Sequence, residues 1–263
     1  MKFCCLASGS SGNCEYVGSE STGILIDAGI TTKRITSGLE GIGVVPGELD
    51  AILITHEHSD HIRGLEVFLN KHHIPVYATM ATLDAIAEYD KKKMIDTSLF
   101  NAVKPDDNFM VGDIEVTTFS TSHDARDPIC YTLTKGDSKL GMATDLGIYD
   151  DYIVSNLEGS TTLFLESNYD QSMLEVGPYP FRLKQRIKSS YGHLSNDMCA
   201  RLILQLLCRG VKNIYLGHLS KENNYPALAY ETVKCELNME YGDISRFNLA
   251  TAMRDAPSCM SVI

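Results

Sequence analysis

Four side chains of metal-ligand type lie within six residues of one another near position 60. The segment reads Ile52-Leu53-Ile54-Thr55-His56-Glu57-His58-Ser59-Asp60-His61, so three imidazoles and one carboxylate follow an apolar, strand-like run. His56 and His58 are two positions apart in an extended or turning segment, so both can face the same side. Imidazole and carboxylate ligands suit zinc, manganese or iron, and the absence of thiolate argues against a purely structural zinc. The segment predicts a metal site, and the alternative is a capped helix with hydrogen-bonded surface histidines.

The His-x-His-x-Asp-His string after a hydrophobic strand resembles the signature of the metallo-β-lactamase superfamily. That resemblance implies three further ligands at strand ends, and His123, Asp145 and His218 stand in the required order. Taken singly, each of these three is an ordinary polar residue at the end of a strand. Asp27 ends another apolar run and would orient a histidine ligand in such a fold. The resemblance assigns one metal to His56, His58 and His123, a second to Asp60, His61 and His218, and a bridging position to Asp145.

The chemistry that this resemblance implies is hydrolysis by a hydroxide held between two cations. Each cation lowers the pKa of the shared water, so hydroxide forms near neutral pH. Two ions about 3.5–4 Å apart can also hold the attacking and non-bridging oxygens of a phosphoryl centre. The expected cofactors are therefore two divalent ions per chain, either zinc, manganese or iron. Phosphodiesters, esters and thioesters are all substrates for such a centre.

Two positions narrow the substrate class within the resemblance. Superfamily members that open β-lactam rings typically carry Cys or Ser where this chain has Asp145. Oxygen-reducing members resemble His-x-Glu-x-Asp, whereas the second ligand here is His58. Hydrolysis of phosphodiesters or thioesters is therefore favoured.

A glutamate and a histidine further along the chain resemble the catalytic pair of tRNase Z-like phosphodiesterases. Glu166 ends an apolar strand, and His193 lies in Gly192-His193-Leu194-Ser195-Asn196, just before a capped helix. On this resemblance Glu166 orients His193, which protonates the leaving alkoxide as a general acid. Asp60, Glu166 and His193 are the expected catalytic residues. Without the resemblance, Glu166 is a strand-end acid and His193 a loop residue that competes with His218 for the last metal position.

Over nearly its whole length the chain resembles the bacterial YycJ (WalJ) family. Matching segments include 8–13, 55–61, 165–170, the Gly-Pro-Tyr-Pro loop at 177–180, 192–196 and 216–224. The family implies a cytoplasmic nuclease, most simply a 5′-to-3′ exonuclease with DNA as its substrate. One alternative is a hydrolase of a small phosphodiester, thioester or lactone. Another is a metal-containing binding or regulatory protein without turnover, against which the complete ligand set argues.

Charge bears on the nucleic-acid interpretation. The 263 residues carry a net charge of −11, so a polyanion must be held by a local patch or by the metals. A basic run at Arg182, Lys184, Arg186 and Lys188 precedes His193, and positions four apart share a helix face. It could hold phosphates, or be a solvated amphipathic helix. The Ser8–Asn13 run could offer backbone N–H groups to a phosphate, although a simple hairpin is the first expectation.

The remaining sequence predicts a single α/β domain over residues 1–263, which the resemblance makes a four-layer αββα sandwich. No run approaches the 18 apolar residues of a membrane span, so a cytoplasmic protein is expected. The eight cysteines form no Cys-x-x-Cys pair, and those in apolar runs, such as Cys199 and Cys208, are expected to be buried thiols. Ser59 is expected to cap a helix over 60–70 that tolerates Gly64. Strands are expected over 3–7, 14–17, 24–27, 51–54, 75–78, 114–119, 129–134, 139–143, 161–165, 211–216 and 246–251. Further helices are expected over 31–39, 82–89, 150–157, 182–189, 196–209 and 226–237.

Overall fold

A computed structural model of the chain describes residues 1–207 and 210–263. The last two positions of the helix expected over 196–209, Cys208 and Arg209, lie outside the described residues. The chain divides into two compact units, so the single-domain organisation stays a prediction. Unit 1 comprises Met1–Ser120, Ala125–Tyr131 and Met253–Val262, and unit 2 comprises Thr121–Asp124, Thr132–Ala252 and Ile263.

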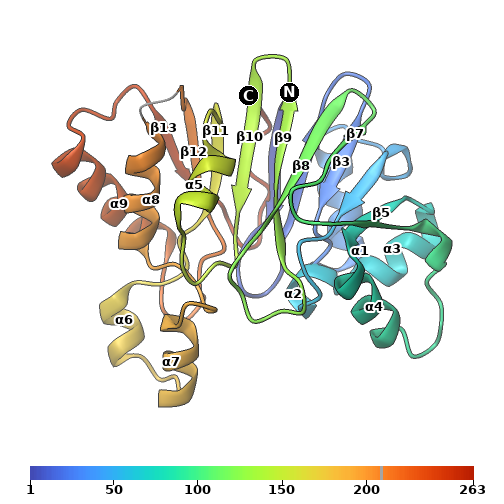
Figure 1. The fold of residues 1–263 in the computed structure, drawn as a ribbon, viewed down its shortest axis with the longest axis horizontal. Coiled ribbons are helices and arrows are strands. Elements are labelled where there is room, and N and C mark those ends of the chain that lie inside the picture. Colours follow the sequence, from blue (N-terminus) through green and yellow to red (C-terminus); the bar gives the residue numbers. More distant parts are fainter. Residues whose placement is uncertain (208–209) are drawn as a thin grey trace. The chain divides into compact units, whose positions relative to one another are not determined.

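Unit 1 is built on a seven-stranded sheet with the order β14-β1-β2-β3-β4-β5-β6 (Figure 1). The first pairs, from β14 to β3, are antiparallel, and the pairs from β3 to β6 are parallel. β7 and β8 pair antiparallel and belong to the second seven-stranded sheet of the chain, whose order is β13-β12-β11-β10-β9-β8-β7. The strands are β1 (Lys2–Ala7), β2 (Cys14–Gly18), β3 (Gly23–Ile26), β4 (Ala51–Leu53), β5 (Val76–Thr79), β6 (Phe100–Val103), β7 (Asn108–Val111), β8 (Ile114–Ser120) and β14 (Ser261–Val262).

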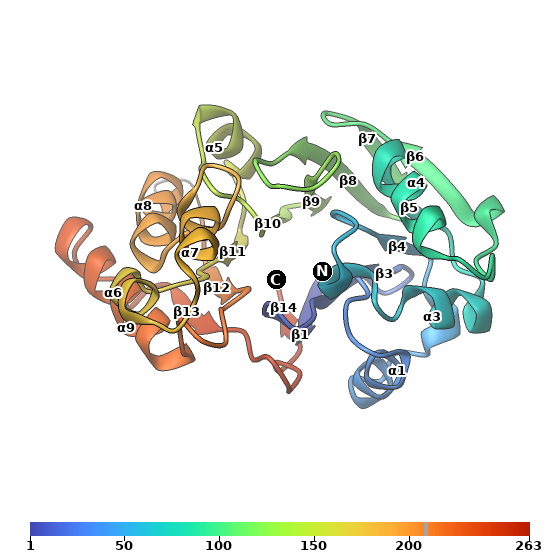
Figure 2. The ribbon, with the colours of Figure 1, turned by 90° about the horizontal axis from the view of Figure 1, so that it is seen from below.

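Helices of unit 1 pack against this sheet and form one apolar core with it. Ile35 of α1, Phe68 of α3 and Leu83 of α4 belong to the same buried cluster as Leu25 and Ile52 of the central strands. Figure 2 shows these three helices around the outer side of β3, β4 and β5. The helices are α1 (Thr32–Gly41), α2 (Ser59–Ile62), α3 (Leu65–His72) and α4 (Met80–Tyr89), with short 3-10 turns at Pro46–Glu48 and Thr97–Leu99.

Unit 2 contains parallel strands whose carboxyl ends lie at one edge. β10 (Ser138–Ala143), β11 (Thr162–Glu166), β12 (Asn213–Gly217) and β13 (Asn248–Thr251) pair in that order, each parallel to the next. β9 (Ile129–Lys135) precedes them in sequence, and its first three residues are counted with unit 1. Because these strands are parallel, the residues that follow β10, β11 and β12 all emerge at the same edge.

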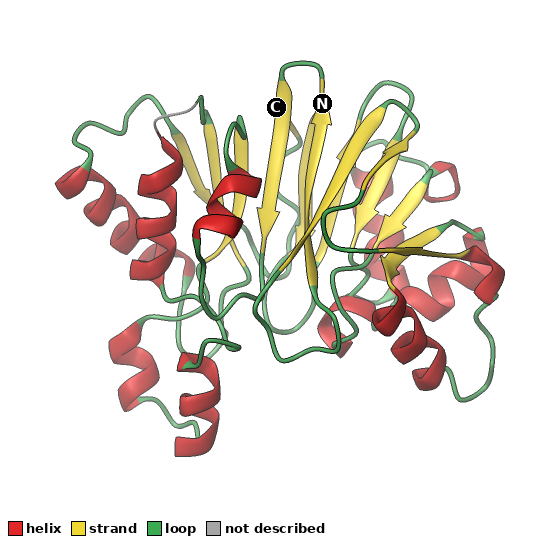
Figure 3. Cartoon of the chain, in the orientation of Figure 1, coloured by secondary structure: helices red, strands yellow, loops and turns green. Residues whose placement is uncertain are grey.

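Five helices accompany the strands of unit 2. α5 packs on β10 and α8, and α9 packs on α8 and β13. α6 and α7 lie side by side (Figure 3), joined through the buried cluster of Tyr169, Leu174 and Ile187. The bounds are α5 (Asp151–Leu157), α6 (Gln171–Val176), α7 (Phe181–Lys188), α8 (Asn196–Leu206) and α9 (Pro226–Glu240).

Most expected elements are present within two or three residues of their expected bounds. The prediction of one continuous helix over 60–70 is wrong. α2 ends at Ile62, α3 begins at Leu65, and the residue before α2 is His58, without a side-chain cap from Ser59. The cause is a close backbone approach, because the N–H of Gly64 donates to the carbonyl of Ala28 at 2.8 Å. Gly64 therefore marks a break between two helices instead of being tolerated within one. β6, β7, α6 and β14 were not expected from the sequence.

Two sequence expectations concern the environment of the chain. The seven described cysteines are all free, and five of them, including Cys199, are buried. Among residues 1–207 and 210–263, no helix combines the length and apolar character needed to cross a bilayer.

Replacing Gly64 by Ala is expected to lower the free energy of unfolding by about 1–3 kcal/mol, the usual cost of overpacking. A Cβ atom at Gly64 would lie 2.1 Å from the main-chain oxygen of Ile30, which cannot rotate away. Gly41 at the end of α1 is the matched control, since a Cβ there meets nothing within 4 Å. Urea titration of both variants measures the effect. Equal stability of Gly64→Ala and Gly41→Ala would contradict the packing described for α2 and α3.

Candidate metal centre

In unit 1 the four clustered ligand candidates are brought together at the start of α2. The rings of His56 and His58 are 4.6 Å apart between centroids, and those of His56 and His61 are 4.1 Å apart. Nε2 of His61 lies 3.7 Å from Oδ2 of Asp60. His56 and His61 are buried, while His58 and Asp60 are partly exposed. The turn after β4 thus gathers three imidazoles and one carboxylate, as the spacing predicted.

A buried carboxylate positions these imidazoles. Asp27 directly follows β3, and its Oδ2 accepts the Nδ1–H of His61 at 2.7 Å. Its other oxygen, Oδ1, accepts the main-chain N–H of Thr55 at 2.9 Å, which ties the end of β3 to the end of β4. The hydroxyl of Thr55 lies 3.1 Å from Nδ1 of His56 and 3.2 Å from Nδ1 of His61. The orienting contact expected of Asp27 is therefore present.

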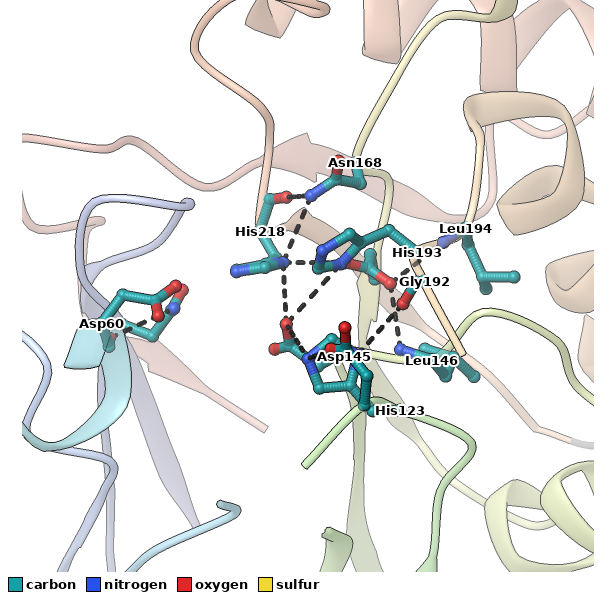
Figure 4. A network of polar contacts seen from close by, with 12 residues as sticks. Asp60, His123, Asp145, Leu146, Asn168, Gly192, His193, Leu194 and His218 are labelled. Carbon is teal, nitrogen blue, oxygen red and sulfur yellow. Dashed lines mark hydrogen bonds and ion pairs between the residues drawn. The ribbon is translucent and has the colours of Figure 1, made fainter. Parts of the chain in front are cut away.

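In unit 2 the strand-end residues also come together (Figure 4). Nδ1–H of His123 donates to the carbonyl of Gly192 at 3.1 Å, so its Nε2 carries the lone pair. That Nε2 lies 3.7 Å from Oδ1 of Asp145. The same Asp145 oxygen is 3.6 Å from Nδ1 of His193 and 3.5 Å from Nδ1 of His218. Asp145 therefore stands at the centre of three imidazoles.

Glu166 is the hydrogen-bonding hub of unit 2. Its Oε1 accepts the Nδ1–H groups of His193 at 2.8 Å and of His218 at 2.7 Å. Its Oε2 accepts the main-chain N–H groups of Leu146 at 3.1 Å and of Leu194 at 3.0 Å. The side chain is fully buried at the end of β11. One carboxylate thus fixes the segments after β10, before α8 and after β12.

These contacts keep Glu166 ionised. Burial alone would raise the pKa of Glu166, but the charges and hydrogen bonds of His193 and His218 hold that pKa below its ordinary value. The ionised carboxylate therefore orients two imidazoles through their Nδ1–H groups.

Exposure separates the roles of the two histidines that compete for the last metal position. The side chain of His218 is 1% exposed, whereas that of His193 is 16% exposed. A residue that transfers a proton to a substrate must be reachable from solvent, and a metal ligand need not be. Within unit 2 the geometry therefore favours His193 as the proton donor and His218 as the ligand.

Both sets of residues fit a divalent cation. In unit 2 one ligand atom each from Asp145, Glu166, His193 and His218 lie within 4.8 Å of one another. The Nε2 lone pair of His123 faces a carboxylate oxygen, an arrangement that a shared cation stabilises. In unit 1, Nδ1–H of His61 donates to Asp27, so Nε2 bears the lone pair that a metal would bind, and here it accepts from Nδ2 of Asn13 at 3.1 Å. The two-metal centre that would combine residues of both units stays a prediction.

Backbone strain occurs at three of these positions. Asp27 and His218 directly follow a strand and have φ values of 56° and 53°, and Asp145, two residues after the end of β10, has a φ of 56°. The left-handed region is uncommon for residues other than glycine, and such strain concentrates at functional sites. At each position the turn aims a carboxylate or an imidazole away from the strand direction.

Two asparagines were not identified from the sequence. Asn13, after the β1–β2 loop, donates from Nδ2 to Nε2 of His61 at 3.1 Å. Asn168, two residues after Glu166, donates from Nδ2 to the carbonyl of His218 at 2.8 Å. Both lie inside segments that match the family. No sequence pattern distinguishes an asparagine that contacts a metal-ligand histidine from any other asparagine.

The basic run on α7 is only partly available to a ligand. Arg186 forms a two-pronged ion pair with Asp124, with Nη2 2.9 Å from Oδ1, and so anchors α7 to the residue after His123. Nζ of Lys184 donates to the carbonyl of Glu175 at 2.7 Å. Arg182 and Lys188 are exposed. Two of the four cations therefore have structural partners instead of a free face.

Similarity to known proteins identifies the family of the chain. Residues 22–218 match the family model described as a beta-lactamase superfamily domain. The exodeoxyribonuclease WalJ of Streptococcus pneumoniae is 41% identical over 237 residues, which cover 90% of this chain and 88% of that protein. The chain belongs to this superfamily and to its WalJ/YycJ family. The exodeoxyribonuclease YycJ of Bacillus anthracis is 37% identical over 233 residues, covering 89% of this chain and 88% of that protein.

Solved structures show the fold. The metallo-beta-lactamase fold protein YhfI of Bacillus subtilis matches with a TM-score of 0.72 at 18% identity, covering 98% of each chain. This confirms the expected αββα class of the WalJ/YycJ family member. The Ser8–Asn13 run proves to be the loop of the β1–β2 hairpin, as first expected.

Replacing Glu166 by Gln is expected to lower the free energy of unfolding by about 1–3 kcal/mol. The amide NH₂ takes the place of one carboxylate oxygen, and each of these oxygens accepts two N–H groups, so two buried donors would face an NH₂ instead of an acceptor. Glu175→Gln on α6 is the matched control, because Glu175 is exposed and its substitution should change stability by less than about 0.5 kcal/mol. Chemical denaturation of both variants checks this. A Glu166→Gln variant as stable as the control would show that Glu166 is not a hub.

Proposed function

We propose that this chain is a metal-dependent phosphodiester hydrolase that acts on DNA as a 5′-to-3′ exonuclease. The observation that carries the proposal is the pair of buried Glu166 and partly exposed His193, joined at 2.8 Å next to the imidazole of His218. The relatives at 41% and 37% identity are named exodeoxyribonucleases, which supports DNA as the substrate class. Free cysteines, such as buried Cys4 and Cys5, are compatible with a location in the cytoplasm.

The proposed ligand set uses both units. His56, His58 and His123 would hold one divalent cation, Asp60, His61 and His218 the second, and Asp145 would bridge them, with zinc, manganese or iron as the candidate ions. When bound, two such cations supply hydroxide at neutral pH and neutralise charge on the phosphoryl oxygens. Asp27 and Glu166 hold the Nδ1–H groups of His61 and His218, so the Nε2 atoms remain for coordination.

His193 would deliver the proton that the leaving oxygen needs. Its Nδ1–H is fixed on Glu166, so the imidazole is oriented and its Nε2 carries the transferable proton. Glu166 is the ionised partner that holds this imidazole in place, because its own pKa is lowered by the contacts described above. Asp60, the carboxylate of the motif at 56–61, would lie beside the attacking hydroxide.

The second candidate is hydrolysis of a small phosphodiester, thioester or lactone. The net charge of −11 favours it, because bulk charge repels a nucleic acid. A metal-binding protein without turnover is the third possibility, against which the Glu166–His193 pair argues.

A parallel assay separates these candidates. We expect the metal-loaded protein to hydrolyse both bis-p-nitrophenyl phosphate and duplex DNA, and to release nucleotides progressively from DNA ends. Chelation should abolish both activities and divalent metal should restore them, since the hydroxide depends on the cations. Turnover of the small diester alone would favour the second candidate. No turnover of either substrate would leave the binding protein as the remaining interpretation.

Replacing His193 by Ala should slow DNA cleavage by about 10²–10⁴-fold, the usual contribution of a general acid. Cleavage of bis-p-nitrophenyl phosphate should fall much less, because p-nitrophenolate leaves without a proton. Metal content, measured by atomic emission, should equal that of the wild type. His72→Ala, a partly exposed histidine at the end of α3, is the control. Loss of metal in His193→Ala would instead make His193 a ligand, and an equal loss on both substrates would exclude the general-acid role.

A further inference from the structure

The loop between β1 and β2 in unit 1 is surrounded by arginines. Nη1 of Arg63 donates to the main-chain oxygen of Ser11 at 3.0 Å, and Nη1 of Arg254 donates to the hydroxyl of Ser11 at 3.1 Å. Arg34 donates to the main-chain oxygen of Arg254 at 3.0 Å. Ser10, at the tip of the loop, is exposed. Two guanidinium groups from distant parts of the sequence therefore meet at one residue of a serine- and glycine-rich loop.

This loop is attached directly to the metal-ligand motif of the same unit. The N–H of Asn13 donates to the main-chain oxygen of Asp60 at 2.8 Å, and its side chain contacts His61. The amide oxygen of Asn13 also accepts the N–H of Gly9 at 2.9 Å, which closes the loop. Arg63 stands two residues after His61, at the end of α2. The arginines are thus held beside the residues proposed to bind metal.

The charge at this loop contrasts with that of the whole chain. Arg34 has an acidic partner, Asp255, at 3.5 Å. Arg63 is exposed and has no acidic partner among the described residues. In a chain with a net charge of −11, a solvent-facing arginine beside a second arginine needs a reason. Guanidinium groups are suited to phosphate because their planar donors match its oxygens.

We propose that the Ser8–Asn13 loop, Arg63 and Arg254 form a subsite for the terminal phosphate of a nucleic-acid strand. The inference rests on the proposed function, because it explains how an exonuclease would select ends. A terminal phosphate carries more negative charge and more free oxygens than an internal diester, so it profits most from two guanidiniums and a hydroxyl-rich loop. With the terminal phosphate in this subsite, the first phosphodiester linkage of the strand would lie next to Asp60 and His61.

The test measures binding and cleavage of three duplexes that differ only at their ends: 5′-phosphorylated, 3′-phosphorylated and unphosphorylated. Fluorescence anisotropy uses the metal-loaded His193→Ala protein, so that the DNA stays intact. Two charge-assisted contacts predict at least about tenfold tighter binding of one phosphorylated end. Whichever end is preferred identifies the strand terminus that the subsite takes. Equal binding of all three duplexes would overturn the proposal.

Variants identify the residues. Arg63→Ala and Arg254→Ala should each reduce the preference for the phosphorylated end to about twofold or less, while hydrolysis of bis-p-nitrophenyl phosphate in the otherwise wild-type protein stays within about threefold. Arg126→Ala removes an equal charge from unit 1, from an arginine paired with Glu88, and should leave the preference unchanged. Arg254→Gln keeps a donor for Ser11 but not the charge, so it should fold like the wild type and still lose the preference.

The outcomes distinguish this inference from the proposed function. If the preference survives in Arg63→Ala and Arg254→Ala, or falls equally in Arg126→Ala, the subsite is wrong. Exonuclease activity without any end-phosphate preference would overturn the subsite and leave the function standing. A binding preference without turnover of DNA or of the small diester would overturn the function instead.

Discussion

A buried carboxylate that accepts several N–H groups is the interaction on which the site of each unit depends. Removing Glu166 from water is costly unless its oxygens are saturated by donors. Two imidazole and two main-chain donors saturate them. The donors belong to segments far apart in sequence, so the buried carboxylate has all of its hydrogen-bond partners only while these segments are in place. In unit 2, the packing of the strand ends and the electrostatics of the site therefore depend on the same set of hydrogen bonds.

In unit 1 the buried carboxylate belongs to an aspartate, Asp27, whose side chain is shorter. Asp27 binds one imidazole N–H and one main-chain N–H, and it reaches them because its own backbone turns into the left-handed region directly after β3. In both units the acid occupies Nδ1 of a histidine, which leaves Nε2 as the nitrogen for a metal. The left-handed turns at Asp145 and His218 serve the same end, since a residue that continued the strand would point its side chain to one face of the sheet. Strain is tolerated where hydrogen bonds over-determine the conformation.

The sequence predicts well what is local. The ligand motif at 56–61 is contiguous, and strand ends before His123, Asp145 and His218 are visible as apolar runs, so a family resemblance suffices to connect them. What is not visible is tertiary contact. The helix break at Gly64 is caused by the chain at Ala28, and Arg186 is committed to Asp124 across 62 positions. Short edge strands such as β6 and β14 have too few buried residues to give a periodic pattern.

Charge distribution then constrains how such a protein handles DNA. A chain with a net charge of −11 cannot hold a duplex along its length by counterion release, because that mechanism needs many phosphate contacts. On α7, for example, the basic side chain of Arg186 binds Asp124 and so orients the loop that carries His123. Affinity for DNA must then come from a small number of strong, localised contacts. The strongest available are metal ions bound by the proposed ligand residues and pairs of guanidinium groups. A few contacts of that kind recognise a particular chemical group in preference to a long tract. A net negative charge combined with a few localised phosphate contacts therefore favours action at strand ends over binding along the duplex.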